Sequence, residues 1–490
     1  MSLKNSLCDI SKHSLIYMLG WGIAAAIRLG MLPLFTRCLG QQDYGIISIL
    51  DSSVELLRIL CALGFSSAIV RFYNDSTDVC FRRTVMATGA CFSLLATVFF
   101  GLGIFPFSKQ ISEFILGNGV NVLYFKLAFA TILLNIIRSV ADSYLTVNKY
   151  SVQYIVINTV QVVFQSSLNL YLVVFRDLGV TGMLVGNLLV AFIFDVGLYA
   201  FVAFKNGLVI DFKVIIPMLK FSLPLVPTVL AAAAMHNLDR FFIKFFASME
   251  DVGLYSLAYQ FPFMLNTVFM SSFVRIWESS SIYEIAKYPD ASYQYGKICT
   301  YFMTILAYAL LILAVMSDLV MKIFAAPSYF TAHEYIPIIS LGVWGYALHT
   351  FVRVGVNLSK KTHLFTINYM LTLIYNVGLN CLLVPKWGAF GAAWATVGTY
   401  FGFSIGGYIV YRKYNCVNIE WSRLVMVVLM AVSLVAIKQN TYIANQLYYI
   451  ILEICLIVLF PILLIAFIFA TKQPEVIVIK NIYAAMRKFI

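Results

Sequence analysis

The sequence predicts an all-α polytopic membrane protein. Hydrophobic residues make up 61% of its 490 residues and charged residues only 11%, whereas globular proteins average about half and about a quarter. A water-soluble chain of this composition has too little polar surface to cover its core. Apolar runs of spanning length recur along the whole chain, and the first six resemble the next six. Lipid is therefore the expected solvent.

Fourteen apolar runs approach the length of about 20 residues that a spanning helix needs, because bilayer hydrocarbon cannot satisfy free backbone groups. The first six are Leu15–Cys38, Tyr44–Val70, Thr84–Phe105, Val122–Thr146, Tyr154–Phe175 and Val180–Phe204. The next six are Val214–Phe246, Gly253–Trp277, Ile298–Ile323, Tyr335–Asn357, Leu364–Val384 and Gly388–Tyr411. The last two are Leu424–Ile437 and Leu447–Ala470. The first run exceeds the roughly 7–15 apolar residues of a signal peptide and is expected to be a retained span.

Basic residues predict the orientation. Counting alternate connections and both tails, one side of the membrane carries 22 Lys and Arg residues and the other carries 8. Since Lys and Arg accumulate in cytoplasmic loops, both termini are expected in the cytoplasm. This asymmetry accounts for the formal net charge of +12. No dense basic run or nucleic-acid motif is present, so no nucleic-acid partner is expected.

Several function classes find no support in the sequence. The nine cysteines are scattered, with no CxxC and no Cys/His spacing suited to zinc, so neither a disulfide framework nor a metal or other cofactor is expected. No connection between spans is long enough for a folded soluble domain. A membrane enzyme of sugar chemistry needs such a domain, so a non-enzymatic role is predicted.

An internal repeat divides the chain. Gly45 in "QDYGIISIL" matches Gly253 in "EDVGLYSLA" at an offset of 208. Gly179 in "LGVTGMLVG" matches Gly388 in "WGAFGAAWA" at an offset of 209. "SLNLYLVV" matches "GLNCLLVP" with the asparagines offset by 211. A repeat of six spans preserves orientation, which predicts two lobes related by a pseudo-twofold axis along the membrane normal, as in many secondary transporters. The expected divisions are residues 1–204, residues 205–412, and residues 413–490 with two extra helices and a cytoplasmic tail.

Three consecutive stretches resemble a known family. "FSLPLVPTVL" from Phe221, "NLDRFFIKFF" from Asn237 and "VGLYSLAYQF" from Val252 are similar to the signature of Wzx-type polysaccharide flippases. These flippases belong to the multidrug/oligosaccharidyl-lipid/polysaccharide (MOP) exporter superfamily. The resemblance extends over the whole chain, from the two six-span lobes to the extra C-terminal pair.

The resemblance implies a function. It implies that undecaprenyl-diphosphate-linked oligosaccharide units, of the O-antigen kind found in lipopolysaccharide, are flipped across the bacterial inner membrane by alternating access. The partners it implies are this lipid-linked glycan and the bilayer, and other membrane proteins of polysaccharide assembly are candidate partners. A multidrug or cation antiporter and a lipid II flippase of the same superfamily remain alternatives, and a membrane enzyme of polysaccharide assembly is a third.

The seventh span carries the main substrate-path candidates. His236, Arg240 and Lys244 follow at i, i+4 and i+8 and are expected to share roughly one helix face, with Asp239 beside them. A cationic face on a helix bent by prolines suits a diphosphate or an acidic sugar. The alternative is local: Asp239 pairs with Arg240, and Lys244 reaches the outer interface.

Arg28 lies about midway along the first span. A charge at that depth costs at least about 2.5 kcal/mol, so Arg28 is expected to face the central cavity and to complement Arg240 around a diphosphate. The alternative is a buried pair with a carboxylate such as Glu55.

Other intramembrane charges are candidates for ion coupling or for structural pairs. Asp51, Glu55 and Arg58 follow at i, i+4 and i+7; they could form a coupling site, or Arg58 could neutralise Glu55 as a static pair. Asp195 has no partner near it in the sequence and is a further coupling candidate. The i, i+4 residues Arg138 and Asp142 are expected to form a structural ion pair.

Overall fold

The computed structural model describes residues 22–117, 120–441 and 446–470. Regular structure in these ranges is helical throughout, without a strand. Ten helices within them are long and apolar enough to cross a membrane. The predicted all-α, multi-pass class is therefore confirmed. Residues 15–21 of the first predicted span, and both termini, lie outside the described residues.

The ten helices and the fourteen predicted spans differ for physical reasons. The helix His363–Val410 contains two predicted spans, which meet at Gly388, where the backbone has φ 55°. Three further predicted spans have no counterpart among the ten helices. One is represented by residues 22–38, which are helical but adjoin undescribed chain. The other two correspond to the helices that begin at Gln41 and Met249. These last two carry charges such as Asp51 and Glu250, which lower their hydropathy.

The first half of the chain forms one set of helices. Its members are residues 22–38, α2 (Gln41–Ala62), α3 (Phe65–Asn74), α4 (Val79–Ile104), α5 (Ser108–Leu116), α6 (Val122–Val147), α7 (Ser151–Leu170), α8 (Gly179–Ala191) and α9 (Gly197–Asn206). Five-residue π-helical turns, Tyr171–Phe175 and Phe192–Val196, follow α7 and α8.

The second half forms another set. Its members are α10 (Phe212–Ser222), α11 (Val226–Phe246), α12 (Met249–Ile276), α13 (Ile282–Ile285), α14 (Ala291–Val315), α15 (Ser317–Phe324), α16 (Tyr335–Val352), α17 (Val354–Ser359), α18 (His363–Val410), α19 (Trp421–Asn440) and α20 (Gln446–Ala470). A π-helical turn, Trp277–Ser281, links α12 to α13, and a 3₁₀ segment, Pro327–Glu334, precedes α16.

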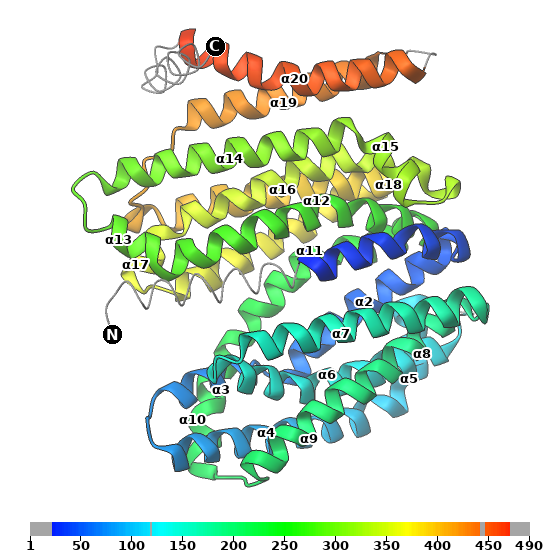
Figure 1. Cartoon of the computed structure of the whole chain (residues 1–490), viewed down its shortest axis with the longest axis vertical. Coiled ribbons are helices and arrows are strands. Elements are labelled where there is room, and N and C mark those ends of the chain that lie inside the picture. The colour runs from blue at the N-terminus through cyan, green and yellow to red at the C-terminus, as the bar shows by residue number, and fades with distance from the viewer. Residues whose placement is uncertain (1–21, 118–119, 442–445, 471–490) are drawn as a thin grey trace.

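Two bundles of roughly parallel helices lie one above the other (Figure 1). We call the lower bundle, which contains α3 to α9, the first bundle, and the upper, which contains α11 to α18, the second bundle. Residues 22–38 and α2 lie between the two and, as part of the first half of the chain, are counted with the first bundle. α19 and α20 lie at the far edge of the second bundle, where α19 packs on α14. The boundaries at residues 204 and 412 remain a prediction.

The seventh predicted span passes between the bundles. Its first part, α10, packs on α3 and α4, whereas α11 packs on α18, α2 and α12. A 3₁₀ turn, Leu223–Leu225, separates the two parts. Pro224 lies in this turn and Pro227 in the first turn of α11. Because proline removes a backbone donor and clashes with the preceding turn, the span bends there.

Glycines allow α2 and α12 to cross at very short distance. A Cβ on Gly45 would lie 2.0 Å from the carbonyl oxygen of Met249, and a Cβ on Gly253 would lie 2.2 Å from that of Gln41. These contacts are reciprocal, since both residue pairs are related by the 208 offset. One turn further, the hydroxyls of Ser48 and Ser256, again 208 apart, are 2.6 Å from each other. The local pseudo-twofold axis therefore passes between these two serines.

A second pair of glycines repeats the same hairpin in both bundles. Gly179 and Gly388 both have positive φ, 51° and 55°. A Cβ on Gly182 would lie 3.0 Å from the carbonyl oxygen of Leu172, and one on Gly391 would lie 2.3 Å from that of Leu383. The pairs match at the offsets 209 and 211 found in the sequence.

The bundles are joined at the end that carries α5 and the 3₁₀ segment Pro327–Glu334, which we call the α5 end (Figure 1). Four hydrogen bonds cross there: Lys244 Nζ to the Phe114 carbonyl at 3.0 Å, the Ala326 amide to Thr36 Oγ1 at 3.1 Å, Tyr329 Oη to the Leu39 carbonyl at 3.0 Å, and Gln41 Nε2 to the Ser328 carbonyl. The opposite end, with α13, α17 and the α3–α4 connection, we call the α13 end. The α5 end is closed in this structure.

The contact between Ser48 and Ser256 predicts a crosslink. In a variant without native cysteines, Ser48→Cys combined with Ser256→Cys should form a disulfide under mild oxidation, because the two side-chain oxygens are already 2.6 Å apart and an S–S bond needs only about 2.05 Å. Electrophoretic mobility after cleavage between the bundles measures it. Ser48→Cys with Ser271→Cys is the control, since residue 271 lies roughly 22 Å further along α12. Equal crosslinking of both pairs would contradict the described crossing.

Candidate functional site

A cavity of about 710 Å³ lies between the two bundles. The first bundle contributes the 22–38 helix, α2, α7 and α8 to its walls, and the second contributes α11 and α12. Most of the wall is apolar or carries hydroxyl and carboxamide groups. Its charged lining residues are Arg28, Asp51 and Arg240, so its formal charge among the described residues is +1.

Arg240 is held in place without an anionic partner. Its Nε donates to Ser48 Oγ at 3.2 Å, and a terminal nitrogen donates to the His236 carbonyl at 2.6 Å. The guanidinium carbon lies 4.7 Å from the centre of the Tyr259 ring. No salt bridge to Arg240 forms within the described ranges. Asp239 does not pair with it. These contacts fix the direction of the guanidinium and leave its charge available to a ligand.

Arg28 reaches the same cavity from the other bundle. It is exposed and, like Arg240, forms no salt bridge among the described residues. Glu55 pairs instead with Arg58 through two contacts of 2.9 and 2.7 Å. The structure therefore contains no static pair between Arg28 and Glu55. Two guanidinium groups, one from each bundle, face one space.

The structure places Asp51 apart from the pair formed by Glu55 and Arg58. Asp51 lines the cavity, whereas the Glu55–Arg58 pair lies outside its lining and is about 40% exposed, with side-chain values of 41% and 38%. Because Glu55 and Arg58 satisfy each other, only Asp51 of the three presents a free charge to the cavity.

The structure does not bring His236, Arg240 and Lys244 to one shared face. His236 Nδ1 lies 2.6 Å from Tyr400 Oη inside the second bundle, and Lys244 reaches the Phe114 carbonyl at the α5 end. Four residues advance an α-helix by about 400°, so an i, i+4, i+8 series turns by about 40° at each step. Because of this rotation along α11, only Arg240 of the three lines the cavity.

Asp239 faces away from the cavity, into the second bundle. It is 1% exposed. Its carboxylate accepts hydrogen bonds from Tyr255 Oη at 2.9 Å, Thr396 Oγ1 at 2.7 Å, Asn380 Nδ2 at 2.9 Å and Asn376 Nδ2 at 3.4 Å. No cation pairs with it within the described ranges. Neutral donors on α12 and α18 thus hold the buried carboxylate.

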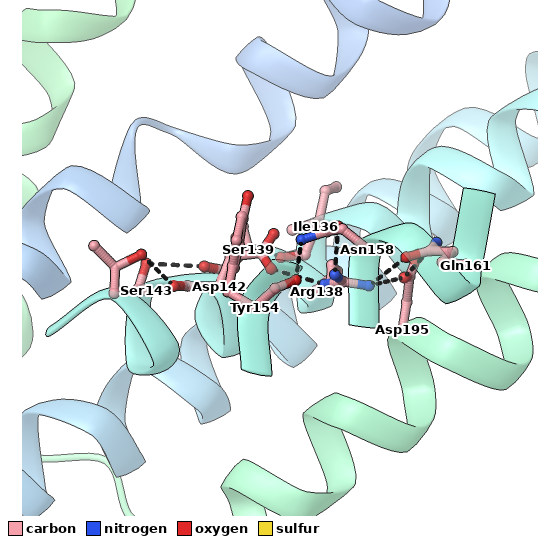
Figure 2. A network of polar contacts seen from close by, with 10 residues as sticks. Ile136, Arg138, Ser139, Asp142, Ser143, Tyr154, Asn158, Gln161 and Asp195 are labelled. Atoms are coloured by element: carbon pink, nitrogen blue, oxygen red, sulfur yellow. Dashed lines mark hydrogen bonds and ion pairs between the residues drawn. The ribbon is translucent and has the colours of Figure 1, made fainter. Parts of the chain in front are cut away.

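A buried charge network crosses the first bundle (Figure 2). Arg138, on α6, pairs with Asp142 at 2.8 Å and with Asp195 at 2.9 Å. Its guanidinium also donates to Asn158 and Gln161 of α7. Asp195 is fully buried and lies in the π-helical turn after α8. The network therefore joins α6, α7 and the α8–α9 segment, and none of its members lines the cavity.

Sequence reasoning missed the carboxamides of the cavity. Those lining it are Gln165, Asn169, Asn187, Asn237 and Gln260. Single amides within apolar runs carry no motif, so nothing local identified them. The repeat offered a signal, since Asn169 matches Asn380 at the 211 offset, but without the fold that pairing indicated only a shared position. No group of three or more metal-ligating side chains is found in the described part of the chain.

Comparison with known proteins supplies two kinds of similarity. Residues 34–281 match the protein family described as polysaccharide biosynthesis protein. The chain is also 22% identical, over 430 residues, to an uncharacterized membrane protein of Methanocaldococcus jannaschii, covering 80% of this chain and 81% of that protein.

Solved structures share the fold. The lipid II flippase MurJ in an inward closed conformation superposes with a TM-score of 0.71 at 12% identity, covering 93% of this chain and 99% of that one. An inward-facing multidrug resistance MATE transporter of the MOP superfamily gives a TM-score of 0.61 at 13% identity, covering 84% and 95%. At these identities the likeness concerns architecture.

The Arg138 network predicts a stability effect. Arg138→Met should lower protein abundance and melting temperature, because Asp195 then lies buried without its cation, a loss of about 3–5 kcal/mol. Asp142 is 36% exposed and can turn to water. Adding Asp195→Leu should recover most of the loss, since apolar groups then replace the buried pair. Membrane yield and thermal melting measure both.

Arg176→Met, at an exposed position, is the control. If the double variant is no more stable than Arg138→Met alone, the Arg138–Asp195 pair does not carry the effect.

Proposed function

The chain belongs to the polysaccharide biosynthesis protein family, and from that premise we propose that it is a flippase for undecaprenyl-diphosphate-linked glycan units. The cargo is an oligosaccharide repeat unit of O-antigen type, moved across the bacterial inner membrane. The fold shared with the solved transporters supports a two-bundle carrier, and the family match supports a glycan as cargo.

The single observation that carries the proposal is that two guanidinium groups without a salt bridge, those of Arg28 and Arg240, line one cavity from the two halves of the chain. Arginine binds phosphate oxygens through two parallel hydrogen bonds and keeps its charge in a partly buried site. A diphosphate offers several oxygens and two phosphorus centres, so each bundle can hold one end of it. The lipid tail would remain in the bilayer, while the sugar occupies the rest of the cavity.

The sign of the charge separates this role from a cation antiporter. An antiporter for cationic drugs needs carboxylates facing its cavity, whereas here two arginines accompany Asp51 alone among the described lining residues. The field within the cavity therefore attracts anions.

Transport would proceed by alternating access. With the α5 end closed, the cavity would receive cargo from the α13 end, which we place in the cytoplasm on the basis of the Lys and Arg distribution. Release would require the hydrogen bonds at the α5 end to open. Lys244, predicted in the substrate path, would then act at this closure through its bond to Phe114.

Arg28 provides the direct test of cargo binding. Deleting the gene should abolish surface polysaccharide, and Arg28→Ala should fail to restore it while protein abundance stays near normal, because Arg28 forms no salt bridge among the described residues. Arg28→Lys should restore it in part, since it keeps the charge but loses the planar fork. Arg37→Ala, an exposed arginine on the same helix outside the cavity lining, is the matched control. Immunoblotting and polysaccharide staining give the two readouts.

Two outcomes would contradict this prediction. If Arg28→Ala loses abundance and Glu55→Ala restores both abundance and export, the arginine serves a static pair. If deletion leaves surface polysaccharide intact and instead blocks cell-wall synthesis, the cargo is lipid II.

Orientation has its own test. In a cysteine-free background, a thiol reagent confined to the periplasm should label Gln110→Cys, at the α5 end, and should not label Thr77→Cys in the α3–α4 connection. Both positions are exposed, so access alone decides the result. Ser108, two residues away, is buried and unsuitable. The reverse labelling pattern would place the α13 end outside.

A further inference from the structure

Three carboxamides form one cluster on the cavity wall of the first bundle. Asn187, on α8, accepts hydrogen bonds at its Oδ1 from Gln165 Nε2 at 2.8 Å and from Asn169 Nδ2 at 2.9 Å, both on α7. All three residues line the cavity. Because a carbonyl oxygen has two lone pairs, the acceptor of Asn187 is fully used.

The second bundle contains matching residues around a carboxylate of its own chain. The repeat offsets of 211 and 209 relate Gln165, Asn169 and Asn187 to Asn376, Asn380 and Thr396. Those three residues donate to the carboxylate of Asp239. The glycine contacts described above, Gly182 on Leu172 and Gly391 on Leu383, show that the two hairpins have the same geometry.

The first bundle lacks the carboxylate. The 208 offset relates Asp239 to Met31, which cannot accept these hydrogen bonds. Asn187 supplies a carbonyl oxygen in its place, and this leaves polar groups unused. Neither the two amide protons of Asn187 Nδ2 nor the Gln165 Oε1 acceptor has a hydrogen-bond partner in the described part of the chain. Asn169 is 4% exposed, and its Oδ1 is unpaired there, as is the Oδ1 of its counterpart Asn380 in the second bundle.

Gly186 makes room for the cluster. A Cβ at this position would lie 2.1 Å from Asn169 Oδ1, so any larger residue would displace the amide. A buried polar atom without a partner, such as Asn169 Oδ1, is rare and costly. Here it borders a cavity, where a ligand can satisfy it.

We propose that Gln165, Asn169 and Asn187 form a subsite for an uncharged, hydroxyl- or acetamido-bearing sugar next to the diphosphate. This rests on the proposed function and adds to it the class of the sugar. The unused groups comprise both donors and acceptors, which match a neutral sugar that offers both. Because the amide donors of Gln165 and Asn169 are already used by Asn187, a carboxylate, which offers acceptors only, would meet their carbonyl groups and find a donor only in Asn187 Nδ2. The two arginines bind the diphosphate, and the amides select the glycan.

The test compares two probes on the purified full-length protein in lipid nanodiscs. Farnesyl diphosphate presents the diphosphate alone, and farnesyl-diphosphate-linked N-acetylglucosamine adds one neutral sugar. Calorimetry should show the glycosylated probe binding about tenfold tighter to wild type, the gain that one or two net hydrogen bonds provide. Farnesyl-diphosphate-linked glucuronic acid, whose sugar carries a carboxylate, should bind no tighter than the neutral probe.

Two variants remove the subsite while the remaining amides keep their hydrogen-bond partners. Asn187→Thr copies the residue at the matching position of the second bundle, whose hydroxyl can still accept from the two amides. Gln165→Leu removes the free acceptor while Asn169 still donates to Asn187. Both should bind farnesyl diphosphate as wild type does and lose the tenfold preference for the sugar. Asn206→Thr is the matched control, because that carboxamide donates to Val202 of its own helix outside the cavity lining.

The outcomes separate the two proposals. If the variants retain the full sugar preference, or if wild type has none or prefers glucuronic acid, the subsite assignment is wrong while the flippase proposal stands. If wild type does not bind farnesyl diphosphate, or binds it equally after Arg28→Ala, the diphosphate site itself is wrong. Melting temperatures near wild type establish that the variants are folded.

Discussion

The crossing of α2 and α12 is the constraint on which the rest of the structure depends. Two glycines, Gly45 and Gly253, let each helix approach the other's backbone more closely than any side chain would permit. This contact sets the pseudo-twofold axis, brings Ser48 beside Ser256 and holds the α5 end together. It also fixes where the bundles part. Beyond the crossing the helices diverge, and the space between them is the cavity into which both bundles place an arginine.

The charges inside the protein divide into two groups with different consequences. Those within a bundle are satisfied there: Arg138 by two carboxylates, and Asp239 by neutral donors on its own bundle's helices. Those between the bundles, Arg28 and Arg240, form no salt bridge among the described residues, and Asp51 is the carboxylate that shares their cavity. A charge at membrane depth without a paired countercharge is expensive, so stability alone gives no reason to retain the second group. Under the proposed function, a ligand carried between the bundles would supply that reason. In the proposed cycle the static networks would hold each bundle together, and the two arginines would let an anion bind to both.

Sequence reasoning reached the fold through its periodic features and missed what depends on distant contacts. The repeat offsets predicted the matching glycines because close helix approaches require glycine wherever they occur. By contrast, the rotation of about 40° at each i, i+4 step places His236 and Arg240 on different faces. The i, i+4 spacing alone does not reveal this difference. Three of the four partners of Asp239 lie on α18, 137 to 157 positions away, and no local sequence pattern indicates them. The carboxamides near Asn187 went unnoticed for the same reason: their meaning appears only when the two bundles are compared and the second is seen to hold a carboxylate.

The most direct test of the central claim is a cryo-electron microscopy structure of the full-length protein in nanodiscs with farnesyl diphosphate at saturating concentration. The account predicts density for the diphosphate within hydrogen-bonding distance of the guanidinium groups of both Arg28 and Arg240, and its absence in the Arg28→Ala variant under the same conditions. A diphosphate bound elsewhere, or bound by one bundle alone and unaffected by the substitution, would contradict it.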